Sequence, residues 1–358
     1  MNFPLVKQVT PMLFGSSVSG AIGSITNPQT LVIPRQARRL AHLFIHANVT
    51  IATPTATAGR DALEGLISSA ELKISDKAGS SRTARKAGSA TLLAWNKRMV
   101  GRNGRFSQTA FGKKTAGTYD LFVPIHLADV SLGETAYVKT SVPLWATNAN
   151  GDGLGEDARL ELNWASAIAA VGLSAGTVTI NYVHAHQHFI EQAEGVQYVP
   201  TELIANDRDW GTSGGDRTYE FPEKGWLAAF LHEGFTSATV RGDVQGSGQG
   251  IWRLYYGRSE RWAWTTKMAQ EEDGLWAQEF PTDVAPGSTV LETGVWLADL
   301  MGPSHTPQAL SPGAIPNLYL SNAGDRARLQ GSSISANATS RITTYKFLTD
   351  DLKTLVGV

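Results

Sequence analysis

The chain has 358 residues, of which 42% are hydrophobic and 18% charged, and its formal net charge is −1. This length is greater than that of a typical single domain and allows two domains. The near-neutral net charge excludes a function based on overall electrostatic attraction to nucleic acid. Cysteine is absent, which excludes disulfides, thiolate metal sites and a cysteine nucleophile. The 36 glycines and 15 prolines, with many Thr, Val and Trp residues, favour strands and turns over helices.

Residues 1–28 are predicted to form an N-terminal arm. Their apolar runs are broken by Pro11 and Gly15, are too short for a membrane span, and lack the basic start and apolar core of a signal peptide. We expect the arm to pack on another part of an assembly, and a disordered tail is the alternative. The predicted anchors are Phe3, Leu5, Met12, Leu13 and Phe14.

Strand-like segments follow from Thr30 onward, separated by turn residues. The longest segment in which apolar and polar residues alternate is Gly176–Phe189. Strict alternation would put Val178 and Ile180 on the same face as His184, His186 and His188. Helical turns are expected only near Ser107–Lys114 and Trp145–Gly155. The other expected strands are Thr30–Ala52, Leu66–Ile74, Tyr119–Leu127 and Ala158–Trp164.

The second half of the chain repeats three short segments of the first half in the same order. Chance matches need not be collinear, so the shared order indicates a duplicated β domain whose second copy has shorter loops. The pairs are Arg38–Asn48 with Gly225–Phe235, His126–Asp129 with Trp296–Asp299, and Thr179–Tyr182 with Ile342–Tyr345.

The repeats and the turn residues Gly195 and Pro200 divide the chain after the arm. The fold class predicted is all-β, with two tandem jelly-roll sandwiches. The first domain is expected at 29–193, a linker at 194–200, the second domain at 201–349 and a tail at 350–358.

His184, His186 and Glu191 reproduce the start of the metal-binding motif by which a cupin presents ligands from a jelly-roll strand. The flanking glycines of that motif are missing, and the equivalent strand of the second copy, "TTYKFLTD", has no histidine. We therefore assign no metal ligand here, and expect His184, His186 and His188 to hydrogen-bond across a subunit contact that their titration makes pH-sensitive.

Two further segments have the residue types of a binding site. Asn148, Asn150 and Asp152 have the spacing of half a calcium loop, but Arg159 stands where a bidentate Glu is needed, so a turn is the favoured interpretation. The stretch Lys77–Lys114 has ten basic residues and no acidic one, which suits phosphate contacts or, equally, acidic loops on neighbours such as Gln270–Gly274.

Tryptophans gather in the second half of the chain. Exposed rings would suit a glycan-binding protein, whereas burial in a core or interface is the commoner role. No nucleophile elbow, phosphate loop or paired-carboxylate cleft is present, so no catalytic or cofactor-binding residue is assigned. The tryptophans are Trp210, Trp226, Trp252, Trp262, Trp264, Trp276 and Trp296.

This organisation of an arm, two duplicated sandwiches and Gly/Ser-rich loops resembles the double jelly-roll major capsid proteins of tailless icosahedral viruses, including bacteriophages with an internal membrane. The resemblance implies a structural protein that forms homotrimers of six rolls, each trimer filling a pseudo-hexagonal tile. It also implies contacts with neighbouring trimers, penton and minor capsid proteins, with the arm tying trimers together or touching the membrane.

The implied location is the virion, with the host cytoplasm during assembly, and no sequence-specific nucleic acid partner or cofactor is implied. Two other classes stay open at this point. A bicupin-like metalloenzyme requires His184, His186 and Glu191 to converge inside a barrel, and a glycan-binding two-sandwich protein requires an exposed groove of Trp rings.

Overall fold

The computed structural model divides the chain into two compact units. Unit 1 comprises Met1–Asn96, Arg105–Glu202 and Asp351–Val358, and unit 2 comprises Lys97–Gly104 and Leu203–Asp350. The residues that the structure describes are 5–11, 20–57, 62–75, 80–99, 112–129, 134–145, 153–191, 195–237, 240–246, 250–266, 268–269, 294–300, 319–320 and 326–349.

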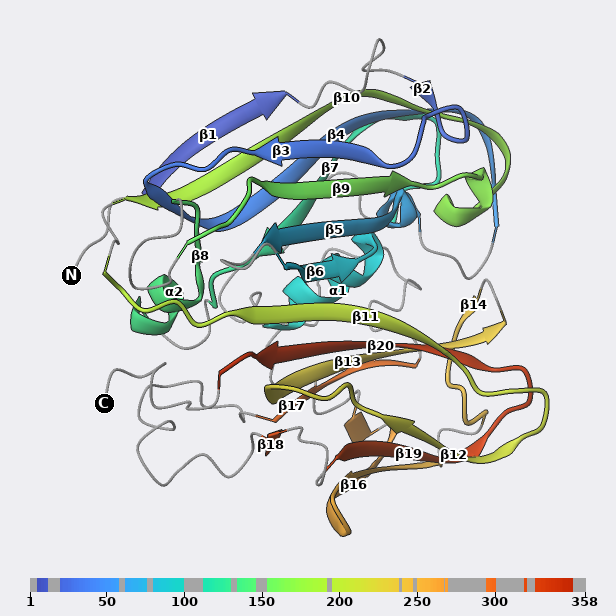
Figure 1. The fold of residues 1–358 in the computed structure, drawn as a ribbon. Coiled ribbons are helices and arrows are strands. Elements are labelled where there is room, and N and C mark those ends of the chain that lie inside the picture. Colours follow the sequence, from blue (N-terminus) through green and yellow to red (C-terminus); the bar gives the residue numbers. More distant parts are fainter. Residues whose placement is uncertain are drawn as a thin grey trace. The chain divides into compact units, whose positions relative to one another are not determined.

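Strands dominate both units, which confirms the all-β prediction (Figure 1). In chain order the described elements are β1 (Leu5–Pro11), β2 (Gly20–Ala21), β3 (Gln29–Ile33), β4 (Arg38–Ala56), η1 (Leu63–Gly65), β5 (Ile67–Ser75), β6 (Ser81–Ala87), α1 (Ser89–Met99), β7 (Gly117–His126), α2 (Glu134–Thr140), β8 (Val142–Pro143), β9 (Ala158–Trp164), η3 (Ile168–Val171), β10 (Leu173–Glu191), β11 (Thr201–Asp209), β12 (Gly215–Glu220), β13 (Trp226–Ser237), β14 (Val240–Arg241), β15 (Ile251–Tyr256), β16 (Ser259–Thr265), β17 (Val295–Asp299), β18 (Tyr319–Leu320), β19 (Ala327–Ile334) and β20 (Thr339–Phe347).

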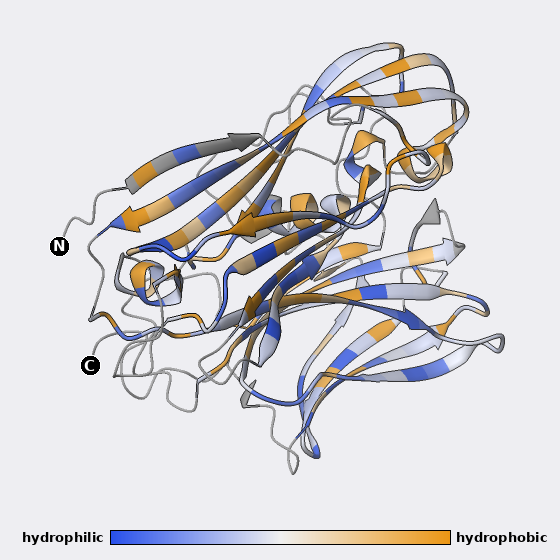
Figure 2. Cartoon of the chain, turned by 45° about the horizontal axis from the view of Figure 1, so that its top comes forward, coloured by the Kyte–Doolittle hydropathy of each residue, from blue (hydrophilic) through white to orange (hydrophobic). Residues whose placement is uncertain are grey.

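Unit 1 is a sandwich of two antiparallel sheets. One sheet has the order β1-β10-β4-β7, and the strands of the other lie in the order β6-β5-β9-β3. Apolar side chains alternate along the strands, as the bands of colour in Figure 2 show, and the inward ones are fully buried. Leu43, Ile45 and Ala47 on β4 and Leu160 and Leu162 on β9 each have 0% exposure, so these alternating residues build the core.

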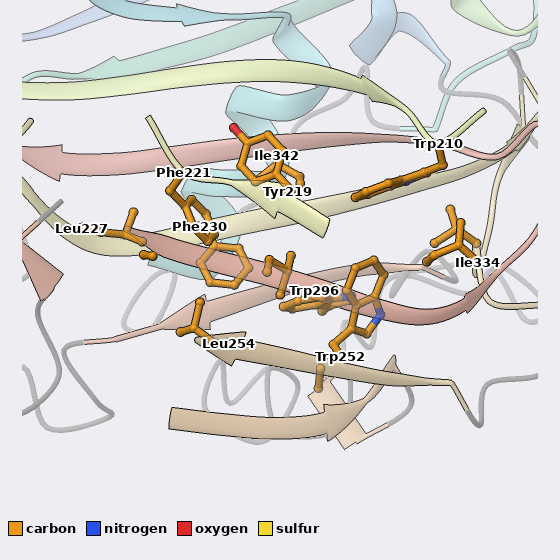
Figure 3. Packing of buried hydrophobic residues seen from close by; sticks show 14 of the residues in the cluster. Trp210, Tyr219, Phe221, Leu227, Phe230, Trp252, Leu254, Trp296, Ile334 and Ile342 are labelled. Carbon is orange, nitrogen blue, oxygen red and sulfur yellow. The ribbon is translucent and has the colours of Figure 1, made fainter. Parts of the chain in front are cut away.

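Unit 2 is also built from two sheets, with strand orders β14-β13-β20-β11 and β12-β19-β15-β16, and β13 pairs antiparallel with both β14 and β20. Its core is aromatic, and Trp210, Phe221, Phe230, Trp252 and Trp296 are each no more than 3% exposed (Figure 3). The Phe230 and Trp296 rings meet edge to face at a centroid distance of 5.6 Å. Large rings in such geometry fill a small core with few side chains.

The three repeated segments fall on strands that pair in the same order in each unit. In unit 1, β4 lies between β10 and β7, and in unit 2, β13 lies between β20 and β17, with all four pairings antiparallel. The first repeat lies in β4 and in β13. In the second repeat, His126 is the last residue of β7, and Trp296–Asp299 lie in β17. The third repeat lies in β10 and in β20. The collinear repeats therefore mark strands with the same neighbours, as a duplication requires.

The two described α-helices were not predicted. Helix α1 has the sequence "SATLLAWNKRM", which is rich in good helix formers, so this signal was present in the sequence and was missed. The Ser89 hydroxyl at its start accepts a hydrogen bond from the Ile67 backbone nitrogen at 3.0 Å and fixes the helix to β5. The turns expected near 107–114 and 145–155 lie mostly outside the described residues.

The expected faces of β10 need one correction. A register irregularity between Ile180 and Tyr182, opposite β4, leaves Asn181 and Tyr182 both half-buried and reverses the alternation. Val178 and Ile180 therefore point into the core, whereas the histidines that follow point away from it. Strict period two failed here because a β-bulge inserts one extra residue into one strand of a pair.

Part of the predicted arm belongs to unit 1. Residues 5–11 form β1 and residues 20–21 form β2, and both strands pair with β10. The Asn27 amide also exchanges two hydrogen bonds with the Trp164 backbone, at 3.0 and 2.9 Å. Among the described residues, no helix has the length and apolar character needed to cross a membrane.

Candidate functional site

Six of the eight histidines line the outer face of the three strands β10, β4 and β7. Outward residues alternate with the core residues of these strands, so the register decides which imidazoles meet. On β4, His42 lies opposite His188 and His126, and His46 lies opposite His184. The bulge in β10 is required for this arrangement, because it turns the three histidines of that strand outward.

The His46 cluster consists of His46, His184 and His186. One ring nitrogen from each residue lies within 4.8 Å of the other two. The His46 centroid lies 6.0 Å from that of His184 and 5.9 Å from that of His186, and the latter two lie 6.5 Å apart. The Nε2 atom of His186 is buried and has no hydrogen-bond partner among the described residues.

The ring of His46 is held from two sides. Its Nε2 lies 2.9 Å from Oδ1 of Asp120, and the same oxygen accepts a hydrogen bond of 2.8 Å from the Asn48 amide. The Phe122 ring stacks on His46 at a centroid distance of 4.4 Å and an interplanar angle of 20°. These contacts fix the orientation of the imidazole before any partner binds.

The His42 cluster consists of His42, His126 and His188, and a hydrogen bond joins the first two. The two Nδ1 atoms of His42 and His126 lie 2.8 Å apart, and Nε2 of His42 lies 2.7 Å from the Tyr137 hydroxyl of α2. Both nitrogens of His42 are therefore engaged within the protein.

Burial keeps several of these imidazoles neutral near pH 7. Desolvation, then repulsion from Arg85 and His188, lowers the pKa of His126 to about 4. Desolvation, followed by His126 and His188, holds the pKa of His42 well below its usual value. Desolvation, followed by His46 and His184, also lowers the pKa of His186. Neutral imidazoles keep a lone pair that can accept a hydrogen bond or bind a metal ion.

The predicted cupin-like set is not brought together. Glu191 forms an ion pair of 2.9 Å with Arg38, and it is not part of the His46 cluster. His184 and His186 point to the outer face of the sheet, whereas a cupin motif presents its ligands inward. Sequence reasoning missed His46 as their neighbour, because the pairing of β4 with β10 joins segments far apart in the chain.

Four described basic side chains of the stretch 77–114 have partners inside the protein. Arg82 donates to the Tyr198 hydroxyl at 2.7 Å, Lys86 lies 3.7 Å from Glu71, and Lys114 donates to the Thr57 carbonyl at 3.0 Å. Arg85 is buried and donates to the carbonyls of His126, Leu127 and Thr201. These contacts favour a structural role for this part of the stretch over binding of phosphates.

The remaining predicted segments divide into two groups. Asn148–Asp152 and Gln270–Gly274 lie outside the described residues, as does Trp276. The other second-half tryptophans are buried or half-buried, and Trp262 and Trp264 pack against the core of unit 2. No exposed Trp surface is present in the described part of unit 2, so the glycan-binding interpretation loses its support.

The chain shares its fold with proteins of known structure. Solved structures that match it over nearly the whole chain are double jelly-roll major capsid proteins, so the chain has the double jelly-roll fold that the sequence predicted. No known family profile matches the sequence, and no curated protein does.

Three of these structures give the extent of the likeness. The major capsid protein of STIV, the Sulfolobus turreted icosahedral virus, superposes with a TM-score of 0.62 at 12% identity, covering 99% of this chain and 100% of that one. The major capsid protein of bacteriophage PM2 gives 0.56 at 12% identity, covering 97% and 99%. The PBCV-1 virus capsid chain gives 0.58 at 11% identity, covering 97% and 94%.

Proposed function

We propose that this chain is the major capsid protein of a tailless icosahedral virus and assembles as a homotrimer. The observation that carries the proposal is coverage: the likeness to capsid proteins extends over 97–99% of the chain and therefore includes both rolls. A match of one roll alone would suit many unrelated proteins, because jelly rolls recur with different functions. Two rolls in one chain, with almost no unmatched length, suit few.

A physical reason connects two rolls with a shell. Three copies of a two-roll chain offer six similar lateral walls, which close into a tile with pseudo-sixfold shape. Each wall is a rigid sandwich whose apolar side chains are already buried in its own core, as in unit 1 and unit 2. Lateral contacts are then free to diverge without loss of the fold.

The proposed partners are further copies of this chain, neighbouring trimers, and penton and minor capsid proteins. The arm and the tail are proposed to tie trimers together or to touch an internal membrane. The proposed location is the virion, and the host cytoplasm while the shell forms. A catalytic role is not favoured, because His184 and His186 lie outside the sandwich and Glu191 is paired with Arg38.

The test is the solution mass of the purified full-length chain, measured by light scattering during size-exclusion chromatography. We expect a stable particle of three times the chain mass of 38.4 kDa, and tiles of pseudo-hexagonal outline by negative-stain electron microscopy. A monomer that persists over a wide concentration series would overturn the proposal.

A further inference from the structure

The His46 cluster differs from an ordinary group of surface histidines in the state of its nitrogens. His186 Nε2 is buried and has no hydrogen-bond partner among the residues that the structure describes, and a buried polar atom without a partner is unfavourable. His46 has its Nε2 engaged by Asp120, so Nδ1 is the nitrogen that it would offer to an ion. By contrast, His42 in the neighbouring cluster already has both nitrogens engaged, by His126 and Tyr137.

We propose that His46, His184 and His186 bind a divalent transition-metal ion, with zinc the natural occupant. A tetrahedral zinc site with Zn–N bonds of about 2.1 Å separates its ligand nitrogens by roughly 3.4 Å. The three nitrogens lie within 4.8 Å of one another, so small side-chain rotations bring them to bonding positions. A fourth position remains for a water molecule or for a donor from another chain.

The ligand types select the class of ion. Imidazole nitrogens suit zinc, copper, nickel and cobalt, whereas calcium and magnesium require oxygen ligands. The chain has no cysteine, so no thiolate competes for the ion. Zinc is favoured over copper and nickel by availability in cells rather than by affinity.

The surroundings of His46 match the outer shell of known histidine metal sites. A metal-bound imidazole commonly donates its second N–H to a carboxylate, which fixes the tautomer and raises the basicity of the ligand. Asp120 occupies this position at 2.9 Å from Nε2, and Asn48 orients the carboxylate. The stacked Phe122 ring restrains rotation of the imidazole.

The ion would join β4 to β10 on the outer face of unit 1. His46 and His184 are directly opposed in the antiparallel pair, and His186 is the next outward residue of β10. A bond across two strands that are far apart in sequence closes a long loop, and it is therefore expected to stabilise unit 1 against unfolding. All three ligands come from one chain, so the site does not depend on the proposed capsid role.

The experiment is titration of the metal-free, untagged full-length chain with zinc, by isothermal calorimetry, and with cobalt, by visible absorption. We expect one ion per chain, tetrahedral cobalt bands, and a higher melting temperature with zinc than with EDTA. His46→Gln, His184→Gln and His186→Gln should each weaken binding by more than the roughly 10–100-fold typical of an outer-shell change. Asp120→Asn should weaken binding by about 10–100-fold.

Two control variants separate this site from general histidine affinity. His188→Gln removes the next outward imidazole of β10, and Glu191→Gln removes the third ligand of the cupin-like pattern. Both should bind zinc as the unmodified chain does, and circular dichroism in EDTA should show that all variants are folded. Absence of binding, or equal losses in the His188 and His186 variants, would overturn the proposal.

Discussion

The buried His232 of unit 2 should make this unit sensitive to acid. The side chain is 1% exposed and stacks on Trp296 at a centroid distance of 5.0 Å, with Trp252 at 4.6 Å. Trp210 Nε1 donates to the Ser340 hydroxyl at 2.8 Å, and that hydroxyl lies 2.9 Å from His232 Nε2. On the other side, His232 Nδ1 lies 3.2 Å from the Gly294 carbonyl.

These partners define a neutral tautomer. The Gly294 carbonyl accepts only, so Nδ1 carries the proton, and Nε2 accepts from the Ser340 hydroxyl. Burial lowers the pKa of His232 to about 3, against a smaller opposing effect of the Gly294 hydrogen bond. The unfolded chain, with a histidine pKa of about 6.5, therefore takes up the proton first as the pH falls.

The sign and the size of the effect follow from this difference. The pKa of His232 is lower in the folded chain than in the unfolded chain. The stability that unit 2 gains from neutral, buried His232 is therefore complete above about pH 6.5 and declines as the pH falls toward 3. The decline is at most about 1.4 kcal/mol per pH unit, and it amounts to roughly 2–3 kcal/mol at pH 4.5.

The assay is urea unfolding between pH 7.5 and 4.5, followed by tryptophan fluorescence at fixed protein concentration. The reference is His232→Asn, which keeps a donor near Gly294 but does not titrate in this range. Other titrating groups, such as His126, are common to both proteins and cancel in the difference. We expect the gap between the two free energies of unfolding to shrink by about 2–3 kcal/mol at pH 4.5. A gap that stays constant would refute the assigned burial and tautomer.

Two further predictions concern packing and hydrogen bonding. Phe230→Ala should destabilise unit 2 by about 3–5 kcal/mol, because the ring is fully buried against Phe221 and Trp296. The control Val32→Ala, at a position that is 51% exposed, should change stability by less than about 0.5 kcal/mol. Urea unfolding of both variants measures the two changes. Arg85→Met should lower the free energy of unfolding of unit 1 by roughly 2–4 kcal/mol, since it removes the guanidinium that donates to the carbonyls of His126, Leu127 and Thr201. Similar thermal melts of Arg85→Met and the unmodified chain would contradict that role.

The sequence by itself determined the fold class and the duplication. Period-two alternation, turn residues and three collinear repeats depend on local composition, and the repeated segments form strands with equivalent neighbours in each unit. Burial or partial burial of the second-half tryptophans that the structure describes was also the expected outcome for large apolar rings in a chain with few charged residues.

Tertiary structure decided the histidine face. The bulge between Ile180 and Tyr182 depends on how β10 pairs with β4, and it reverses which residues of β10 point outward. The same pairing places His46 beside His184 and leaves Glu191 with Arg38 instead. Register and bulges are set by hydrogen bonds between segments far apart in the chain, so no local pattern contains them, and the ligand set of a site built across strands follows only from the folded sheet.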